Sequence, residues 1–122
     1  MESCGNLGLM NEKGWGKEKD PGRAIELYEQ ACRAGVPVHC RNVGRLSEGD
    51  SGFPVDPERA GRAYQRALEL ALEQCEERVA ESCAVAGYLY KDGKGTGENM
   101  ERARMLLRKS CKMGYSWACK SL

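Results

Sequence analysis

Hydrophobic residues recur along this chain at the spacing of an amphipathic helix. Tyr64, Leu68, Leu72 and Cys75 follow one another at i, i+4, i+8 and i+11, which places them on one helical face. The pattern is repetitive, because alignment of the chain with itself superposes small and large apolar positions in three copies. These columns are Ala24, Ala60 and Ala103, and four residues later Tyr28, Tyr64 and Leu107.

The cysteines give the length of the repeat. Cys4, Cys40, Cys83 and Cys119 are separated by 36, 43 and 36 residues, and internal periods of about 20 to 50 residues are typical of solenoids. We expect one domain over residues 1–122. It consists of repeats at 4–39, 40–82 and 83–118, followed by the start of a further helix at 119–122.

Each repeat is predicted to contain two helices. The second helix begins after a residue that favours the N-cap position, namely Asp20, Asp56 or Asn99, and proline follows both aspartates. In the first and third copies it ends near Gly35 and Gly114, which suit a left-handed C-terminal cap.

The middle copy differs in its second helix. Seven extra residues lie between Ala67 and Cys75, and because about 3.6 residues make a turn they add two turns without moving Cys75 to another face. Arg78 stands where the other copies have glycine, so we expect this copy to turn differently.

The first helix of each pair runs from its cysteine to a glycine-rich bend, such as 14–16 or 93–95. Gly8, Gly44 and Gly87 lie inside these helices, where glycine costs about 1 kcal/mol relative to alanine. We therefore expect close helix approach, with the alanine column opposite the glycines. The predicted fold is all-α, with antiparallel helix pairs stacked side by side in an α/α solenoid.

Composition and charge exclude several classes of function. Hydrophobic residues make up 41% of the chain and charged residues 30%, which is typical of a soluble globular domain. The net charge of +1 provides no field that would attract nucleic acid or an anionic membrane. No apolar window approaches the length of a membrane span, and residues 1–6 lack the features of a signal peptide. We expect neither a nucleic-acid partner nor membrane insertion.

The paired cysteines are expected to form disulfides. Their spacing of eight residues joins the last turn of one helix to the first turn of the next, and closing so short a loop contributes roughly 2 to 3 kcal/mol. The expected disulfides are Cys32–Cys40, Cys75–Cys83 and Cys111–Cys119. The alternative is that reduced cysteines pack as small apolar residues.

Other roles for the cysteines fit the spacing less well. Structural zinc sites usually present C-x2–4-C pairs in fours, so we predict no metal ligand and no cofactor. A catalytic pair of His39 with Cys40 would require a thiol that the disulfide consumes. Cys4 has no partner at the eight-residue spacing, either because its pair precedes residue 1 or because it is a free thiol.

Disulfides favour an oxidising compartment, so we expect a periplasmic or secreted protein whose export signal lies upstream of this sequence. Reduced cysteines would instead indicate the cytoplasm.

The aligned columns resemble the Sel1-like branch of the tetratricopeptide repeats. The resemblance is carried by Cys4-Gly5-Asn6-Leu7-Gly8, by Gly14-x-Gly16, and by the series Asp20, Ala24, Tyr28, Ala31, Cys32 and Gly35. The regular cysteine pairs further resemble the Helicobacter cysteine-rich protein family. This resemblance implies a secreted or periplasmic scaffold for protein interactions with one disulfide per repeat. It also implies an alternative function, the binding or weak hydrolysis of β-lactams. An alternative location, the mitochondrial intermembrane space, is implied by related repeats.

In tetratricopeptide-like stacks the first helices line a concave groove. The residues that this arrangement presents are Leu9, Glu12, Arg41, Arg45, Glu48, Tyr88 and Lys91. Arg41 and Arg45 are suited to hold a carboxylate, such as a peptide C-terminus, through bidentate hydrogen bonds, and Tyr88 offers an aromatic platform. The alternative is that the arginines belong to a solvated helix face.

No residue is assigned a catalytic role. None of the serines lies in an S-x-x-K motif, and the glycine-rich bends recur at repeat positions rather than forming a phosphate loop. A second basic set is interpreted as an aid to solubility, and it comprises Arg102, Arg104, Arg108, Lys109 and Lys112. We predict a monomeric scaffold that binds a protein or peptide. The alternatives are a β-lactamase-type hydrolase and a passive segment of a larger repeat protein.

Overall fold

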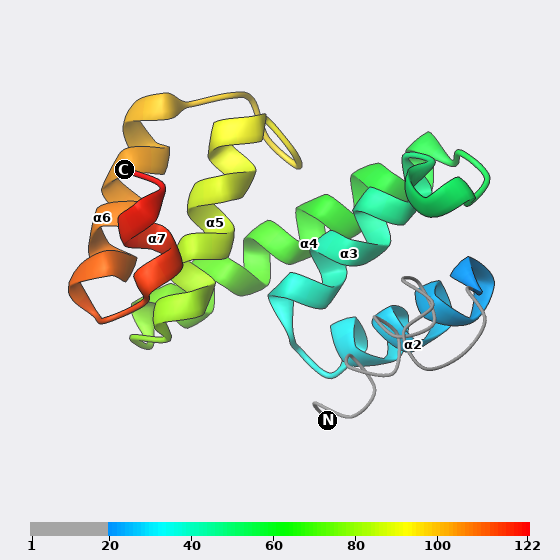
Figure 1. The fold of residues 1–122 in the computed structure, drawn as a ribbon, viewed down its shortest axis with the longest axis horizontal. Helices are drawn as coiled ribbons and strands as arrows, with labels where there is room; N and C mark the ends of the chain where they lie inside the picture. The colour runs from blue at the N-terminus through cyan, green and yellow to red at the C-terminus, as the bar shows by residue number, and fades with distance from the viewer. Residues whose placement is uncertain (1–19) are drawn as a thin grey trace. The chain divides into compact units, whose positions relative to one another are not determined.

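The computed structural model describes residues 20–122, and within them all regular structure is helical (Figure 1). The elements are α2 (Pro21–Arg33), α3 (Pro37–Ser47), the short 3-10 helix η1 (Asp50–Gly52), α4 (Pro57–Glu76), α5 (Ala80–Asp92), α6 (Met100–Lys112) and α7 (Ser116–Lys120). The predicted all-α fold of helix pairs is confirmed. The described chain forms two compact units, residues 20–64 and Gln65–Leu122.

The predicted starts of the second helices are confirmed. The side chains of Asp20, Asp56 and Asn99 each accept a hydrogen bond from the backbone N–H three residues later, at 3.0, 3.2 and 3.0 Å. These bonds satisfy a donor that has no partner inside the helix. Helix α4 has 20 residues against 13 in α2 and in α6, so the predicted insertion of two turns is also confirmed.

The prediction that the middle copy turns differently is wrong. Gly35, Arg78 and Gly114 all adopt positive φ values, of 95°, 68° and 98°. In each copy the amide of the next residue donates to the carbonyl five residues earlier, at 3.2, 3.0 and 3.2 Å. This is the Schellman arrangement. Its hydrogen bonds hold Arg78 in the left-handed region, although this backbone conformation is unfavourable for residues that have a Cβ atom.

Three disulfides connect the helices at these turns, as the spacing predicted. Cys32–Cys40 joins α2 to α3, Cys75–Cys83 joins α4 to α5, and Cys111–Cys119 joins α6 to α7. The Cα atoms of the three pairs are 4.7, 4.6 and 4.8 Å apart, within the usual range for a disulfide. Each disulfide therefore fixes the end of one helix against the start of the next.

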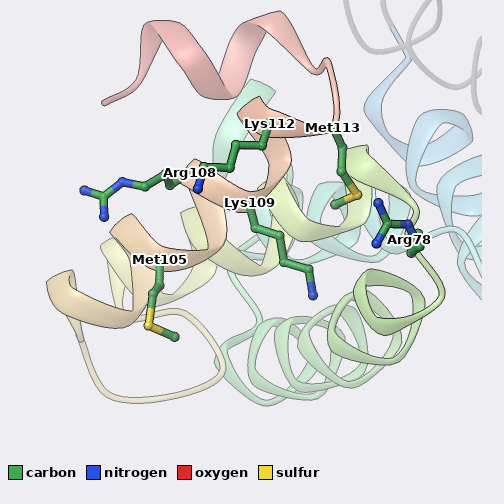
Figure 2. A pocket seen from close by; sticks show the side chains of 6 residues that line it. All are labelled: Arg78, Met105, Arg108, Lys109, Lys112 and Met113. Atoms are coloured by element: carbon green, nitrogen blue, oxygen red, sulfur yellow. The ribbon is translucent and has the colours of Figure 1, made fainter.

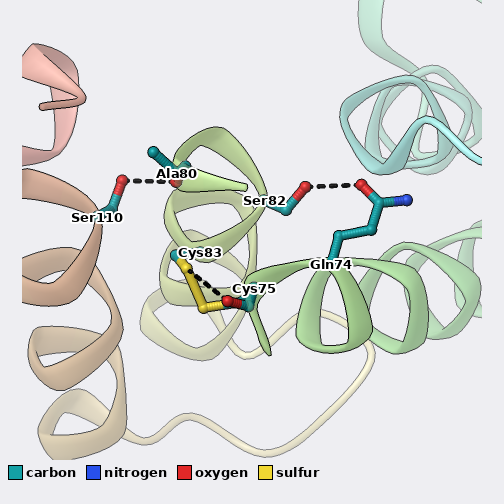
Figure 3. The surroundings of a disulfide bond; sticks show 6 residues. All are labelled: Gln74, Cys75, Ala80, Ser82, Cys83 and Ser110. Atoms are coloured by element: carbon teal, nitrogen blue, oxygen red, sulfur yellow. Dashed lines mark hydrogen bonds between the residues drawn. A yellow bond between two sulfur atoms is a disulfide. The ribbon is translucent and has the colours of Figure 1, made fainter. Parts of the chain in front are cut away.

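Side-chain hydrogen bonds accompany the middle disulfide. Figure 3 shows Ser82 Oγ donating to Gln74 Oε1 at 2.8 Å, which links α5 to α4 beside the disulfide. Ser110 of α6 donates to the carbonyl of Ala80 at 2.7 Å. Ser110 is fully buried, so this bond satisfies a hydroxyl that would otherwise lose its contact with water.

Each unit has its own core. In residues 20–64, Tyr28 and Leu46 are fully buried and pack with small and branched residues from α2, α3 and α4. This cluster comprises Ala24, Ile25, Tyr28, Val43, Leu46 and Ala63, with Phe53 against it. In the other unit, Ala84, Leu107 and Ala118 form the cluster, and Tyr88, Cys111 and Tyr115 pack on it. Helix α7 thus completes the core that α5 and α6 begin.

The glycines inside the first helices make the predicted close contacts, but with different partners. A Cβ at Gly44 would lie 2.7 Å from the ring of Tyr64, and one at Gly87 would lie 2.9 Å from Cγ of Leu107. The alanine column was expected opposite the glycines. The atoms nearest to the two glycines belong to the column one turn later, Tyr64 and Leu107, and the backbone carbonyl of Ala103 follows at 3.2 Å from Gly87.

Replacing Gly44 with alanine is expected to destabilise the protein. The added methyl group overlaps the Tyr64 ring, whose hydroxyl is hydrogen-bonded to Glu48 and cannot easily move. Overpacking costs about 1 to 3 kcal/mol and the gain in helix propensity returns about 1 kcal/mol. We expect the free energy of unfolding, measured by chemical denaturation with the disulfides intact, to fall by up to about 2 kcal/mol.

Gly61 supplies the matched control, because it lies in α4 and no atom lies within 4 Å of the position that a Cβ would take there. Gly61→Ala should leave stability unchanged or raise it by up to about 1 kcal/mol. Equal stabilities of Gly44→Ala and Gly61→Ala would show that the Tyr64 contact does not require glycine.

Candidate functional site

The predicted groove residues are distributed over the chain. Arg41 and Arg45 lie one turn apart on α3 and Glu48 follows that helix, all within residues 20–64. Tyr88 and Lys91 lie on α5, in the unit Gln65–Leu122. The two remaining residues, Leu9 and Glu12, lie outside the described residues, as does Cys4.

A network of charged groups and a tyrosine covers the face of α3. Arg45 forms an ion pair with Asp50, and its other terminal nitrogen donates to Asn42 Oδ1 at 3.4 Å. Tyr64 donates from its hydroxyl to Glu48 Oε1 at 2.6 Å. Burial, and then the hydrogen bond to Glu48, raise the pKa of Tyr64, so its hydroxyl remains a donor at neutral pH.

This network determines what the arginines can bind. The Arg45 side chain is 29% exposed and the Asp50 side chain 47%, and an ion pair with this much solvent contact contributes about 0 to 1 kcal/mol. An incoming carboxylate can therefore replace or share Asp50 at small cost. Arg41 is half-buried on the same helix and supplies a second guanidinium. The arrangement suits a carboxylate, because Asp50 and Asn42 already orient the guanidinium of Arg45.

Tyr88 has an internal role that the sequence did not indicate. Its hydroxyl lies 2.8 Å from Ser121 Oγ, and its ring packs on the cluster of Ala84, Leu107 and Ala118. Tyr88 thus joins α5 to the end of α7. Lys91, one turn later on α5, is exposed.

His39 lies in the first turn of α3, at the loop-to-helix junction. Its ring stacks on Tyr28, with centroids 5.5 Å apart and an angle of 14° between the planes, and Asn42 Nδ2 lies 3.3 Å from Nδ1. Burial lowers the pKa of His39 from its ordinary value. The neighbouring Cys40 is in a disulfide, so it offers no thiolate to this imidazole.

The second basic set contains a grouping that the sequence interpretation missed. Arg108, Lys109 and Lys112 of α6 line a hollow of about 470 Å³ together with Arg78 and two methionines (Figure 2). Helical spacing alone did not find it, because Arg78 comes from the turn between α4 and α5, about 30 residues earlier in the chain. Arg104 does not line the hollow.

Residues 20–122 hold neither a metal-binding cluster nor a membrane-spanning helix. Within that range, no three His, Cys, Asp or Glu side chains lie close enough together to hold a metal ion. No helix in the described part of the chain has the length and apolar character that a membrane span requires.

Comparison with known families identifies the repeat. The family model described as Sel1 repeat matches residues 2–36, 40–72 and 80–115. These segments cover most of the chain, and each contains one predicted helix pair or most of one.

Curated relatives share the repeat at low identity. The chain is 28% identical over 113 residues to cytochrome c oxidase assembly factor 7 of Xenopus tropicalis, a match that covers 90% of this chain and 46% of the relative. The assembly factor 7 of Mus musculus is 37% identical over 60 residues, covering 46% of this chain and 26% of that protein. The chain therefore spans about half the length of the curated relatives it matches, or less.

Solved structures share the fold. A Sel1 repeat protein from Oxalobacter formigenes aligns with a TM-score of 0.62 and 26% identity, over 96% of this chain and 45% of that one. Cysteine rich protein B of Helicobacter pylori aligns with a TM-score of 0.57 and 21% identity, over 98% of this chain and 87% of that one. The predicted solenoid fold with disulfides is confirmed by these likenesses together with the three bonded pairs.

The half-buried His39 is expected to make stability depend on pH. Because burial lowers its folded-state pKa below 6.5, the unfolded chain binds a proton more readily as pH falls through that value. The contribution of neutral His39 to the stability of the folded protein is therefore fully present above the unfolded-state pKa and is lost as pH falls through the folded-state pKa. We expect the free energy of unfolding to decrease as the pH is lowered from about 7.5 to about 5.5.

His39→Phe separates this titration from packing, because phenylalanine keeps a ring against Tyr28 and has no proton to bind. His39 is the only histidine in the sequence, so the variant should lose the pH dependence in this window. The same decrease in the wild type and the variant would assign it to other groups.

Proposed function

The chain belongs to the Sel1 repeat family, and we propose that it acts as a protein-binding scaffold whose first helices hold the ligand. Sel1 repeat proteins generally mediate protein interactions. The observation that carries the proposal is the α3 face, where Arg41 and a pre-oriented Arg45 stand on a helix fixed by a disulfide. A rigid helix positions binding groups without an ordering cost on association.

The likeness to cytochrome c oxidase assembly factors suggests the kind of partner. Assembly of a multisubunit complex requires proteins that bind individual subunits, and a helical repeat offers an extended surface for this. We propose that this chain contributes such repeats and binds a protein subunit during assembly. The disulfides favour an oxidising compartment for this activity, since cytosolic thiols are kept reduced.

The proposed contact is a carboxylate held by Arg41 and Arg45. Glu48 and Asp50 orient the surrounding side chains through Tyr64 and Arg45. A ligand with a free C-terminus meets the arginines through bidentate hydrogen bonds, each worth about 1.5 to 3 kcal/mol when a charged group takes part.

Charge reversal of the arginines should weaken this binding. The probe is an array of peptides that end at the C-termini of cytochrome c oxidase subunits, each made as the free acid and as the amide. We expect a subset of the acids to bind, the amides to bind at least about tenfold more weakly, and Arg41→Glu with Arg45→Glu to reduce binding by about tenfold or more.

Arg62→Glu with Arg66→Glu is the matched control, because both arginines are exposed on α4 and the change in net charge is the same. This variant should retain binding. Equal binding of acids and amides, or equal losses in the two double variants, would contradict the proposed carboxylate site.

A further inference from the structure

The hollow on α6 is lined by four basic residues and two methionines. Its lining consists of Arg78, Met105, Arg108, Lys109, Lys112 and Met113. Figure 2 shows Lys109 extending from α6 between Met105 on one side and Met113 and Arg78 on the other, whereas Arg108 and Lys112 lie on the side away from Arg78. The whole site lies within the unit Gln65–Leu122.

Within residues 20–122, the cations that line this hollow have no acidic partner. No acidic residue lines it, and within the part of the chain that the structure describes none of its four cations forms an ion pair. Four like charges around one concavity repel one another and concentrate a positive potential there. An anionic partner would relieve that repulsion.

The helix dipole accounts for only part of this arrangement. Lys109 and Lys112 lie in the last turn of α6, where cations are generally favourable. Arg78 belongs to another segment and stands in the left-handed region at a position where the other copies have glycine.

Apolar surface accompanies the charge. The side chain of Met105 is 61% exposed, and Met105 and Lys109 also line an adjoining hollow of about 550 Å³. The other lining residues of that hollow are Leu72, Cys75, Glu76, Arg102 and Leu106. Methionine is common at surfaces that accept varied apolar groups, since its side chain is flexible and polarisable.

We propose that the α6 hollow is a second binding surface, which takes an acidic amphipathic segment of a partner protein. Carboxylates of the segment would meet Lys109, Arg108, Lys112 and Arg78, and an apolar side chain would lie against Met105 and Met113. This site is separate from the carboxylate site on α3 and does not depend on it. Mixed charge and apolar contact distinguishes it from a purely electrostatic attraction.

The probe is a synthetic peptide of roughly four helical turns, with glutamates on one face and leucines on the other. Its affinity is measured by fluorescence anisotropy near physiological ionic strength, where interactions between distant charges are screened. Two control peptides accompany it: in the lysine twin each glutamate is replaced by lysine, and in the serine twin each leucine is replaced by serine. We expect binding of the first peptide only, weakened about tenfold by Lys109→Glu and several-fold by Met105→Ser.

Arg104→Glu is the matched control, since Arg104 is an exposed cation of α6 outside the hollow. It should change the affinity less than about twofold. Equal losses in Arg104→Glu and Lys109→Glu, undiminished binding of the serine twin, or no binding of the acidic peptide would each overturn the proposal. Preferential binding to vesicles containing anionic lipid over the peptide would overturn it in favour of a membrane surface.

Arg78→Gly provides a further test, because it separates the contribution of Arg78 to binding from its effect on stability. Removing the strained Cβ should raise the melting temperature, while the loss of one cation weakens the acidic peptide several-fold. Weaker binding together with higher stability would support the assignment, and unchanged binding would overturn the place of Arg78 in the site. Because the arginines of α3 are intact in all these variants, failure of this site is distinguishable from failure of the carboxylate site.

Discussion

The disulfide across each helical turn is the constraint on which the rest of this structure depends. It joins the last turn of one helix to the first turn of the next, with Cα atoms less than 5 Å apart in all three pairs. Each closes a loop of only about eight residues, worth roughly 2 to 3 kcal/mol by loop-closure entropy. Small domains have total stabilities of about 5 to 15 kcal/mol, so three such links are a large contribution for units with cores as small as these.

The fixed turns also explain local features that propensity alone would not select. Arg78 takes the conformation that Gly35 and Gly114 adopt freely, because the flanking disulfide and the Schellman hydrogen bonds hold the chain on that path. The contact between α3 and α4, which no disulfide joins, depends instead on Gly44, whose missing side chain leaves room for the Tyr64 ring. Tyr64 then reaches Glu48, so the glycine contact and the charged surface of α3 are parts of one arrangement.

Spacing predicted most of the fold. The N-capping residues, the two-turn insertion in α4 and the three disulfides all followed from positions in the sequence, because each depends on contacts between near neighbours in the chain. The missed features depend on side chains from different segments. Leucine and tyrosine rather than alanine oppose the glycines, Tyr88 binds the end of α7, and Arg78 joins the basic residues of α6. Periodicity assigns residues to a helix face, but it does not say which side chain of the neighbouring element meets them.

Disulfides join α2 to α3, α4 to α5 and α6 to α7, and non-reducing peptide mapping of the intact protein tests this pairing. We expect three links, Cys32–Cys40, Cys75–Cys83 and Cys111–Cys119, with Cys4 as the one cysteine left for alkylation. Seven free thiols in protein isolated with its native redox state preserved, or links between cysteines of different pairs, would contradict this arrangement.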